Sequence, residues 1–194
     1  MLVRYLTHPE VKMDPAVPAS EWELDERGKA RIEAFATAGL LANTAYIFSS
    51  SQKMASQSAA IIADRLSLFP VAFPEMDESD NMTSGYLPEK SFLDHFKRFF
   101  SKPEESAGDG WETAMDAQDR IAAAYQMAME CVISSGMRGD VLMVGHGRVG
   151  ALLYCYLTGQ AIGQDFTPPS PGFYFTYDWG ARSMLHGWRS MEES

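Results

Sequence analysis

Cysteine is scarce in this chain. Only Cys131 and Cys155 occur among its 194 residues, a number that excludes a disulfide framework and a cysteine-rich zinc site. Both cysteines lie in apolar runs, AMECVI and LLYCYL. We therefore expect two buried thiols in a protein of a reducing compartment.

Positive charge is also in short supply. Lysine and arginine together number 16, against 26 aspartates and glutamates, which gives a net charge of −10 at pH 7. Proteins that bind nucleic acid or anionic membranes carry a basic face, so this balance argues against both partners. An anionic substrate must instead meet a local positive pocket that the overall field of the protein does not supply.

The chain also lacks a long hydrophobic run. The apolar stretch in MLVRYLTHPEV is too short for a signal peptide, and no run reaches the roughly 18 apolar residues of a membrane helix. We therefore expect a soluble, cytoplasmic protein. Hydrophobic residues make up 46% of the sequence, enough to bury one large core, so we expect a single domain over residues 1–194.

Short apolar runs alternate with helical patterns along the chain. Expected strands lie at 1–7, 44–50, 69–73 and 140–145, expected helices at 25–38, 52–66, 89–100, 110–135 and 147–159, and a late hairpin within 172–188. This alternation predicts an α/β fold, a three-layer sandwich with a mainly parallel central sheet flanked by helices. In such sheets ligands bind beyond the carboxyl ends of the strands.

Two of the four histidines follow strands of this expected sheet. His8 ends the first strand, and His146 directly follows DVLMVG, the clearest strand of the chain. A single histidine at a strand end is usually structural, but two at carboxyl ends of one parallel sheet can converge on one crevice. His95 and His186 have no such position, and we interpret both as structural.

The turn after the second of these histidines favours an anion. Gly147 opens a helix, whose first N–H groups are unpaired and carry a partial positive charge. Arg148 lies in the same first turn. Its side chain either points to solvent or faces a bound anion.

The same segment matches the pattern Gly-x-Gly-x-x-Gly through Gly145, Gly147 and Gly150. We set a dinucleotide site aside for two reasons. Too few residues follow to complete a dinucleotide-binding half, and the acid about 20 residues on, Asp165, lies in a Gly/Pro loop instead of at a strand end.

These motifs, in this order over nearly the whole chain, resemble the histidine phosphatase superfamily, which includes the cofactor-dependent phosphoglycerate mutases and many broad phosphatases. YLTHPEV takes the place of an apolar strand followed by Arg-His-Gly-Glu. FSSSQKMASQSA corresponds to Ser-Ser-Pro-Leu-x-Arg-Ala-x-Gln-Thr-Ala, and VGHGRVGALL to Ser-His-Gly-Gly-Val. THPEV, ESDNMTSGYLP, GWETAMDAQDRI and LHGWR are similar to a bacterial branch of this superfamily.

The resemblance implies a phosphoglycerate mutase-like fold and a set of catalytic residues. His8 would be the nucleophile that takes the phosphoryl group as phosphohistidine. His146 would hydrogen-bond the phosphoryl oxygens and stabilise their charge. An acid of the loop 74–88 would protonate the leaving oxygen and later activate water. Glu78 is our first choice for this acid and Glu75 the alternative; otherwise the loop is only a solvated acidic surface.

Both arginines that clamp the phosphate in that family are replaced. Their positions hold Thr7 and Met54, and neither side chain substitutes for a bidentate guanidinium. The remaining nearby cations are those of Lys53 and Arg148. The residues that we expect to contact phosphate are Thr7, Ser50, Lys53, Gly147 and Arg148.

Two functions are compatible with these residues. The first is a phosphomonoesterase that needs no cofactor or metal and acts on a small organic phosphate. The second, suggested by the lost arginines, is a degenerate member of the fold that binds a phosphoryl ligand or a protein without turnover. A mutase lacks a second arginine cluster here, and no His/Asp/Glu spacing resembles the ligand set of a metal-dependent hydrolase. A homodimer through the aromatic strand GFYFTYDWG stays open.

Overall fold

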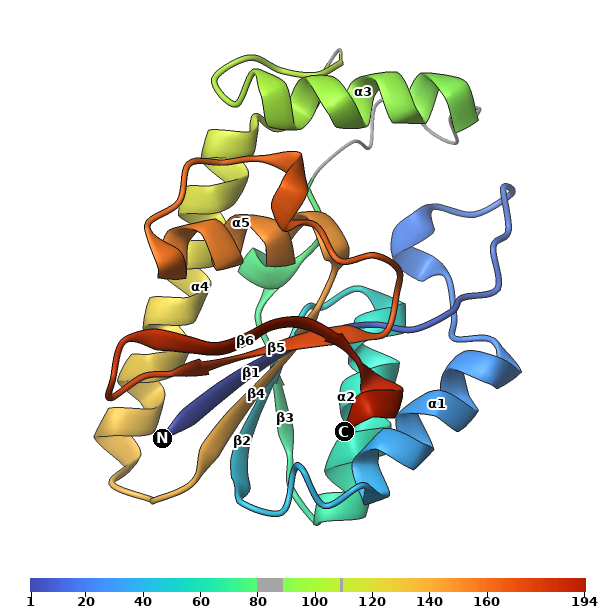
Figure 1. Ribbon diagram of the computed structural model, residues 1–194. Helices are drawn as coiled ribbons and strands as arrows, with labels where there is room; N and C mark the ends of the chain where they lie inside the picture. The colour runs from blue at the N-terminus through green and yellow to red at the C-terminus, as the bar shows by residue number, and fades with distance from the viewer. Residues whose placement is uncertain (80–88, 109) are drawn as a thin grey trace.

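A six-stranded sheet forms the centre of the computed structural model, which describes residues 1–79, 89–108 and 110–194 (Figure 1). The order across the sheet is β3-β2-β4-β1-β5-β6. The strands are β1 (Leu2–Thr7), β2 (Thr44–Ser49), β3 (Pro70–Ala72), β4 (Asp140–Gly145), β5 (Phe173–Asp178) and β6 (Ser183–Ser190). The first four run parallel, and the β5–β6 hairpin adds antiparallel to β1. The expected mainly parallel sheet is confirmed.

Helices cover both faces of this sheet, which confirms the three-layer sandwich (Figure 1). The helices are α1 (Glu26–Thr37), α2 (Lys53–Leu66), α3 (Glu89–Ser101), α4 (Ala114–Ser135) and α5 (Gly147–Thr158). Short 3-10 turns are η1 (Ala19–Glu21), η2 (Pro74–Met76), η4 (Gln164–Phe166) and η5 (Met191–Glu193). Within the described residues, none of the helices is long and apolar enough to cross a membrane.

Alternation along the central strands separates two cores. Val141 and Met143 of β4 belong to a cluster with α4 and α5, whereas Leu142 and Val144 belong to a cluster with α1 and α2. All four side chains are fully buried. A strand buried on both faces reads as a continuous apolar run, which is why DVLMVG is the clearest strand in the sequence.

Helix ends follow local capping chemistry. The Asp25 side chain accepts the Gly28 N–H at 2.7 Å and caps α1 as its position predicts. The longest helix, α4, begins at Ala114 and not at residue 110, where the sequence pattern places its start. Thr113 caps it, because the hydroxyl of Thr113 accepts the Asp116 N–H at 3.0 Å. A threonine whose side chain caps the first free N–H groups is a favoured helix start, which sets the beginning of α4 after residues 110–112.

One of the two cysteines departs from the expectation. Cys155 is buried in α5, as expected, but Cys131 is exposed on α4. The neighbouring side chains of Met129 and Val132 are buried. Since consecutive residues of a helix point about 100° apart, an apolar run on a helix does not bury every member.

The candidate site lies at the carboxyl ends of the parallel strands β1, β2 and β4. Thr7 at the end of β1 is in register with Gly145 at the end of β4. The His8 N–H donates to the Gly145 carbonyl at 2.9 Å, and the Ser50 N–H donates to the Val144 carbonyl at 2.9 Å. The residues that follow β1, β2 and β4 therefore begin at one edge of the sheet.

The glycines after β4 have a packing explanation. Tyr5 of β1 is fully buried, and a Cβ atom on either Gly145 or Gly150 would collide with its side chain. The Tyr5 hydroxyl accepts the His146 N–H at 3.0 Å and donates to the His146 carbonyl at 3.1 Å. The Gly-x-Gly-x-x-Gly pattern thus lets Tyr5 hold the turn between β4 and α5.

This contact generates a stability prediction. We expect Gly150→Ala to lower the free energy of unfolding by about 1–3 kcal/mol, because the added methyl overpacks against the Tyr5 and Trp188 rings. Gly163→Ala is the matched control, since its Cβ would meet nothing nearer than 3.7 Å. Urea unfolding of both variants measures the difference. Equal stability of Gly150→Ala and the wild type would contradict this role of Tyr5.

Candidate active site

Two histidine rings lie side by side at this edge of the sheet. The ring centroids of His8 and His146 are 5.2 Å apart, and the ring planes are inclined at 66°. His146 is almost fully buried, with 2% of its surface exposed, whereas His8 is partly exposed. The structure therefore brings together the two histidines that the sequence places at strand ends.

His8 has its reactive nitrogen free. Burial lowers the pKa of His8, although the Pro9 carbonyl and the Glu78 charge act in the opposite direction, so its imidazole is neutral at neutral pH. Its Nδ1 lies 2.7 Å from the Pro9 carbonyl oxygen. A carbonyl only accepts, so we assign the single ring proton to Nδ1. Nε2 then carries the lone pair that a nucleophile needs.

His146 is also neutral in the free protein. Burial, together with the adjacent His8 and Arg148, lowers the pKa of His146 to about 3 against the opposing charges of Glu78 and Asp77. Its Nε2 lies 2.8 Å from the hydroxyl of Ser50. Ser50 is fully buried at the end of β2, so this expected phosphate contact lies beside His146.

The Glu78 carboxylate lies at the N-terminus of α5. Its carboxylate accepts the N–H groups of Arg148 at 3.2 Å and Val149 at 3.3 Å. Burial alone would raise the pKa of Glu78. The charge of Arg148 and the backbone N–H donors of Ser79 and Arg148 outweigh burial, and the pKa lies below its ordinary value. Glu78 is thus ionised in the free protein and acts electrostatically on both histidines.

Glu75, the alternative acid, is positioned differently. Its backbone carbonyl accepts Arg120 Nη1 at 2.8 Å, and the Asp77 carbonyl accepts the same nitrogen at 2.9 Å. Two further bonds of 2.8 Å join the Arg120 guanidinium to the Glu112 carboxylate. This arginine anchors the segment that carries both Glu75 and Glu78. The remainder of the loop 74–88, from residue 80 onward, lies outside the described residues.

Arg148 does not point to solvent, and that interpretation is wrong. Only 7% of the residue is exposed, and its Nε lies 3.6 Å from the Glu78 carboxylate. Its guanidinium carbon also lies 5.4–5.9 Å from the ring centroids of Phe92, Phe99 and Trp111. Arg148 therefore faces the Glu78 carboxylate of the same chain. The other interpretation, that it faces a bound anion, stays a prediction.

Two of the expected phosphate contacts are engaged elsewhere. The Lys53 ammonium lies 2.7 Å from the Glu23 carboxylate. The Thr7 hydroxyl donates to the Phe173 carbonyl at 3.2 Å and accepts the N–H groups of Gly172 and Phe173. In this arrangement Lys53 neutralises a neighbouring acid, and Thr7 fastens β1 to the start of β5.

The position of the second family arginine is also filled by packing. Met54 is a residue of α2, and its side chain is buried in the core that α1 and α2 form with the sheet. The first N–H of α5, that of Gly147, remains available, since it has no hydrogen-bond partner in the described part of the chain. Within that part, no three His, Cys, Asp or Glu side chains are grouped closely enough to hold a metal ion.

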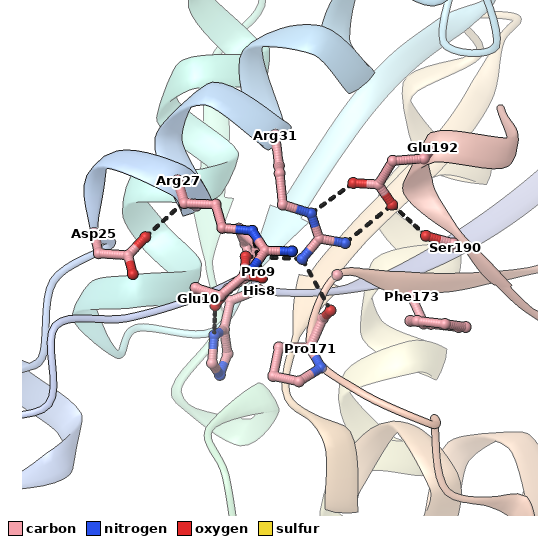
Figure 2. Close-up of polar contacts among 12 residues, drawn as sticks. His8, Pro9, Glu10, Asp25, Arg27, Arg31, Pro171, Phe173, Ser190 and Glu192 are labelled. Carbon is pink, nitrogen blue, oxygen red and sulfur yellow. Dashed lines mark hydrogen bonds and ion pairs between the residues drawn. The ribbon is translucent and has the colours of Figure 1, made fainter.

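A network of ion pairs fixes the segment after His8 (Figure 2). Arg31 of α1 donates to Glu10 at 2.8 Å, to Glu192 at 2.6 and 3.1 Å, and to the Pro171 carbonyl at 3.2 Å. Its hydrogen bonds lower the pKa of Glu192 to about 2. The His8 carbonyl in turn accepts the Gly172 N–H at 3.0 Å. The nucleophile candidate is thus tied to α1 and to the C-terminal η5.

The other two histidines pack away from this pair. The His95 ring stacks on Trp111 with centroids 5.1 Å apart, and its Nδ1 lies 2.7 Å from the Ser91 carbonyl. The His186 ring lies edge-on to Tyr174 at 5.1 Å. Both arrangements agree with structural roles.

Sequence reasoning missed three residues that organise the site, Tyr5, Asp77 and Arg120. Asp77 directly precedes Glu78 in an acidic run, and this position beside a candidate acid is the one sequence feature that could have pointed to it. Tyr5 is one of the core residues of β1, so its pattern indicates only burial, and Arg120 lies on a helix 42 residues after Glu78. Their contacts join distant parts of the chain, which local patterns do not report.

Known proteins were compared with this chain and this fold. A family model of the histidine phosphatase superfamily (branch 1) matches residues 9–169, directly after His8. A search of curated proteins finds no match. A mycobacterial glucosyl-3-phosphoglycerate phosphatase solved with inorganic phosphate has 17% sequence identity and a TM-score of 0.81, with 100% of this chain and 99% of the other covered.

Two further structures have the same fold. The α-ribazole phosphatase from Shigella flexneri has 15% identity and a TM-score of 0.71, with 98% of this chain and 97% of the other covered. YhfR of Bacillus stearothermophilus has 19% identity and a TM-score of 0.74, with 96% and 94% covered. These likenesses concern the fold. The family model spans well over half of the sequence, and the protein therefore belongs to the histidine phosphatase superfamily.

Proposed function

We propose that this protein is a phosphomonoesterase that hydrolyses a small organic phosphate through a phosphohistidine on His8. The observation that carries the proposal is the pair of adjacent neutral imidazoles, 5.2 Å apart, at the carboxyl ends of β1 and β4. His8 offers a free Nε2 lone pair because its Nδ1 proton is bound to the Pro9 carbonyl. Family membership and the phosphatases among the structures of the same fold support this choice of reaction.

The reaction proceeds in two displacements. In the first, the Nε2 lone pair of His8 bonds to phosphorus while the ester P–O bond breaks, and the leaving oxygen takes a proton from Glu78. In the second, Glu78 accepts a proton from water as the water oxygen bonds to phosphorus. The P–N bond then breaks, and inorganic phosphate and neutral His8 remain. His146 and the Gly147 N–H bind the phosphoryl oxygens.

Glu78 must gain a proton before it can act as the acid. In the free protein it is ionised against Arg148 and the α5 N–H groups. A phosphate group brought beside this carboxylate repels it, and the repulsion raises the pKa of Glu78. Substrate binding and protonation of Glu78 are therefore coupled. In the free protein Glu78 stays ionised in its ion pair with Arg148, and both histidines stay neutral.

A second candidate function is ligand binding without turnover. It is favoured by one specific observation, the engagement of Thr7 and Met54 in backbone bonding and core packing where the family has arginines. A phosphate dianion needs charged or hydrogen-bonding partners in a water-poor site. This candidate keeps the fold and the histidine pair but assigns no chemical step to His8.

The first test of the enzyme proposal is the loss of the nucleophile. Wild-type protein is expected to hydrolyse a chromogenic phosphate ester without added metal, and His8→Ala to lose at least about a thousandfold in kcat/KM. His186→Ala is the matched control, because that ring packs on Tyr174, away from the pair. Equal background rates of wild type and His8→Ala over several esters would instead support binding without turnover.

The second test concerns the pH dependence of Glu78. Its pKa in the free protein is lowered, while kcat/KM requires its protonated form, so kcat/KM is expected to fall as the pH rises from about 5 to about 8. Glu78→Gln should remove the Glu78 contribution to this fall and bind inorganic phosphate more tightly, since one carboxylate is gone.

The leaving group separates this role from a structural one. With an alkyl phosphate, Glu78→Gln is expected to lower kcat by about 10²–10⁴-fold, and with 4-nitrophenyl phosphate by much less, because nitrophenolate leaves without a proton. Equal losses for both substrates would show that Glu78 is not the proton donor. Glu75→Gln is the matched control and should retain wild-type rates.

A further inference from the structure

A chain of short hydrogen bonds continues behind the His146 ring. Ser50 Oγ lies 2.8 Å from His146 Nε2 and donates to Asp77 Oδ1 at 2.7 Å. Asp77 Oδ1 also accepts the Ser51 N–H at 2.7 Å, and Oδ2 accepts the Ser51 hydroxyl at 2.7 Å. Ser50 is fully buried and His146 is 2% exposed, so water has little access to the bond between them. The bonds between Asp77 and Ser51 lie at the exposed end of this hydrogen-bond chain.

Counting donors assigns the proton between His146 and Ser50. The hydroxyl of Ser50 has one proton, and the Asp77 carboxylate takes it. Ser50 Oγ accepts the Gln52 N–H at 3.1 Å, and its remaining lone pair faces His146. An oxygen without a further proton only accepts there, so the proton between the two side chains belongs to Nε2 of His146.

Asp77 is itself held firmly in place. Its backbone carbonyl accepts Arg120, and its N–H donates to the Pro74 carbonyl at 3.0 Å. Arg120 is fixed in turn by its two bonds to Glu112. The carboxylate therefore approaches Ser50 from an anchored segment, and it is the member of the chain whose charge decides where the Ser50 proton points.

We propose that Asp77 is a positioning residue for His146, and that it acts through Ser50 to hold the ring proton on Nε2. The two histidines are then opposite tautomers, with His8 protonated on Nδ1 and His146 on Nε2. This leaves Nδ1 as the one ring nitrogen of His146 that can bond a ligand. Only the catalytic consequence rests on the proposed function; the tautomer is a property of the free protein.

The catalytic consequence is that His146 becomes an imidazolium only when phosphate binds. When a phosphate binds, Nδ1 of His146 takes up a proton from solvent and donates a hydrogen bond to a phosphoryl oxygen, while Nε2–H keeps its hydrogen bond to Ser50. The Asp77 charge stabilises the resulting imidazolium, as a buried aspartate does for the histidine of a serine-protease triad. This cation supplies part of the positive charge that Thr7 and Met54 do not.

The charged groups around His146 either raise or lower its pKa. His8 from the end of β1 and Arg148 from α5 disfavour the imidazolium, whereas Glu78 and Asp77 from the segment after η2 favour it. When phosphate binds and Glu78 takes up a proton, the phosphate charge replaces the Glu78 charge on the favourable side. The imidazolium is therefore expected with ligand bound and absent from the free protein.

The experiment is nitrogen NMR of the histidine rings in the folded, full-length protein near neutral pH. Wild type should show a protonated Nε2 and an unprotonated Nδ1 for His146. Ser50→Ala and Asp77→Asn should shift the population toward protonated Nδ1, and Ser50→Thr should restore the wild-type pattern. Tyr5→Phe is the matched control, since it removes the bonds to the His146 backbone and leaves Ser50 and Asp77 in place.

Inorganic phosphate is the second probe. Saturating phosphate should protonate both ring nitrogens of His146 in wild type, and Asp77→Asn should weaken phosphate binding by at least about tenfold, one pKa unit of imidazolium stabilisation. If Asp77→Asn does not fold, Ser50→Ala carries both measurements. A free protein with His146 protonated on Nδ1, or an unchanged tautomer in Ser50→Ala, would overturn the proposal. Correct tautomers without any ester hydrolysis would overturn only the proposed function.

Discussion

Burial of two imidazoles at one edge of the sheet is the constraint on which this site depends. The rings of His8 and His146 meet because β1 and β4 run parallel with Thr7 opposite Gly145. Because burial disfavours the charged form, the pKa values of both rings are lowered and neither ring carries a charge in the free protein. Every other feature of the site either fixes the protons of these rings or compensates for their missing charge.

The nearby cations are already neutralised by carboxylates. Arg148 pairs with Glu78, Arg120 with Glu112, and Lys53 with Glu23. The chain as a whole carries a net charge of −10, so its long-range field does not attract phosphate either. We infer that proton uptake at the moment when phosphate binds removes the negative charge of Glu78 and adds a positive charge to His146. Family members that keep two clamp arginines carry such charge permanently.

Much of the fold could be predicted from the sequence, because its signals are local. A doubly buried strand such as DVLMVG reads as one apolar run, and Asp25 caps α1 at the expected position. The alternation of strands and helices predicted the fold class, and the resemblance of the motifs indicated the family; both are confirmed. The histidine pair followed from a topological rule, since carboxyl ends of parallel strands meet at one edge.

The side-chain partners could not be predicted in the same way. Arg148 lies in the first turn of α5, and sequence alone left it between solvent and a bound anion; its partner Glu78 is 70 residues away. Lys53 and Thr7 were expected at the phosphate, yet each has a partner that no local pattern indicates, Glu23 and the backbone of β5. Such contacts depend on how loops return over the sheet, which is a tertiary property.

Trapping the covalent intermediate tests the central claim most directly. Wild-type protein would be mixed with a phosphate ester, quenched in alkali within one turnover, digested and analysed by mass spectrometry. We predict one phosphoryl group, on the peptide that contains His8, and none in His8→Ala. A phosphoryl group on another residue, or ester hydrolysis without any phosphorylated peptide at all quench times, would contradict a phosphohistidine mechanism at His8.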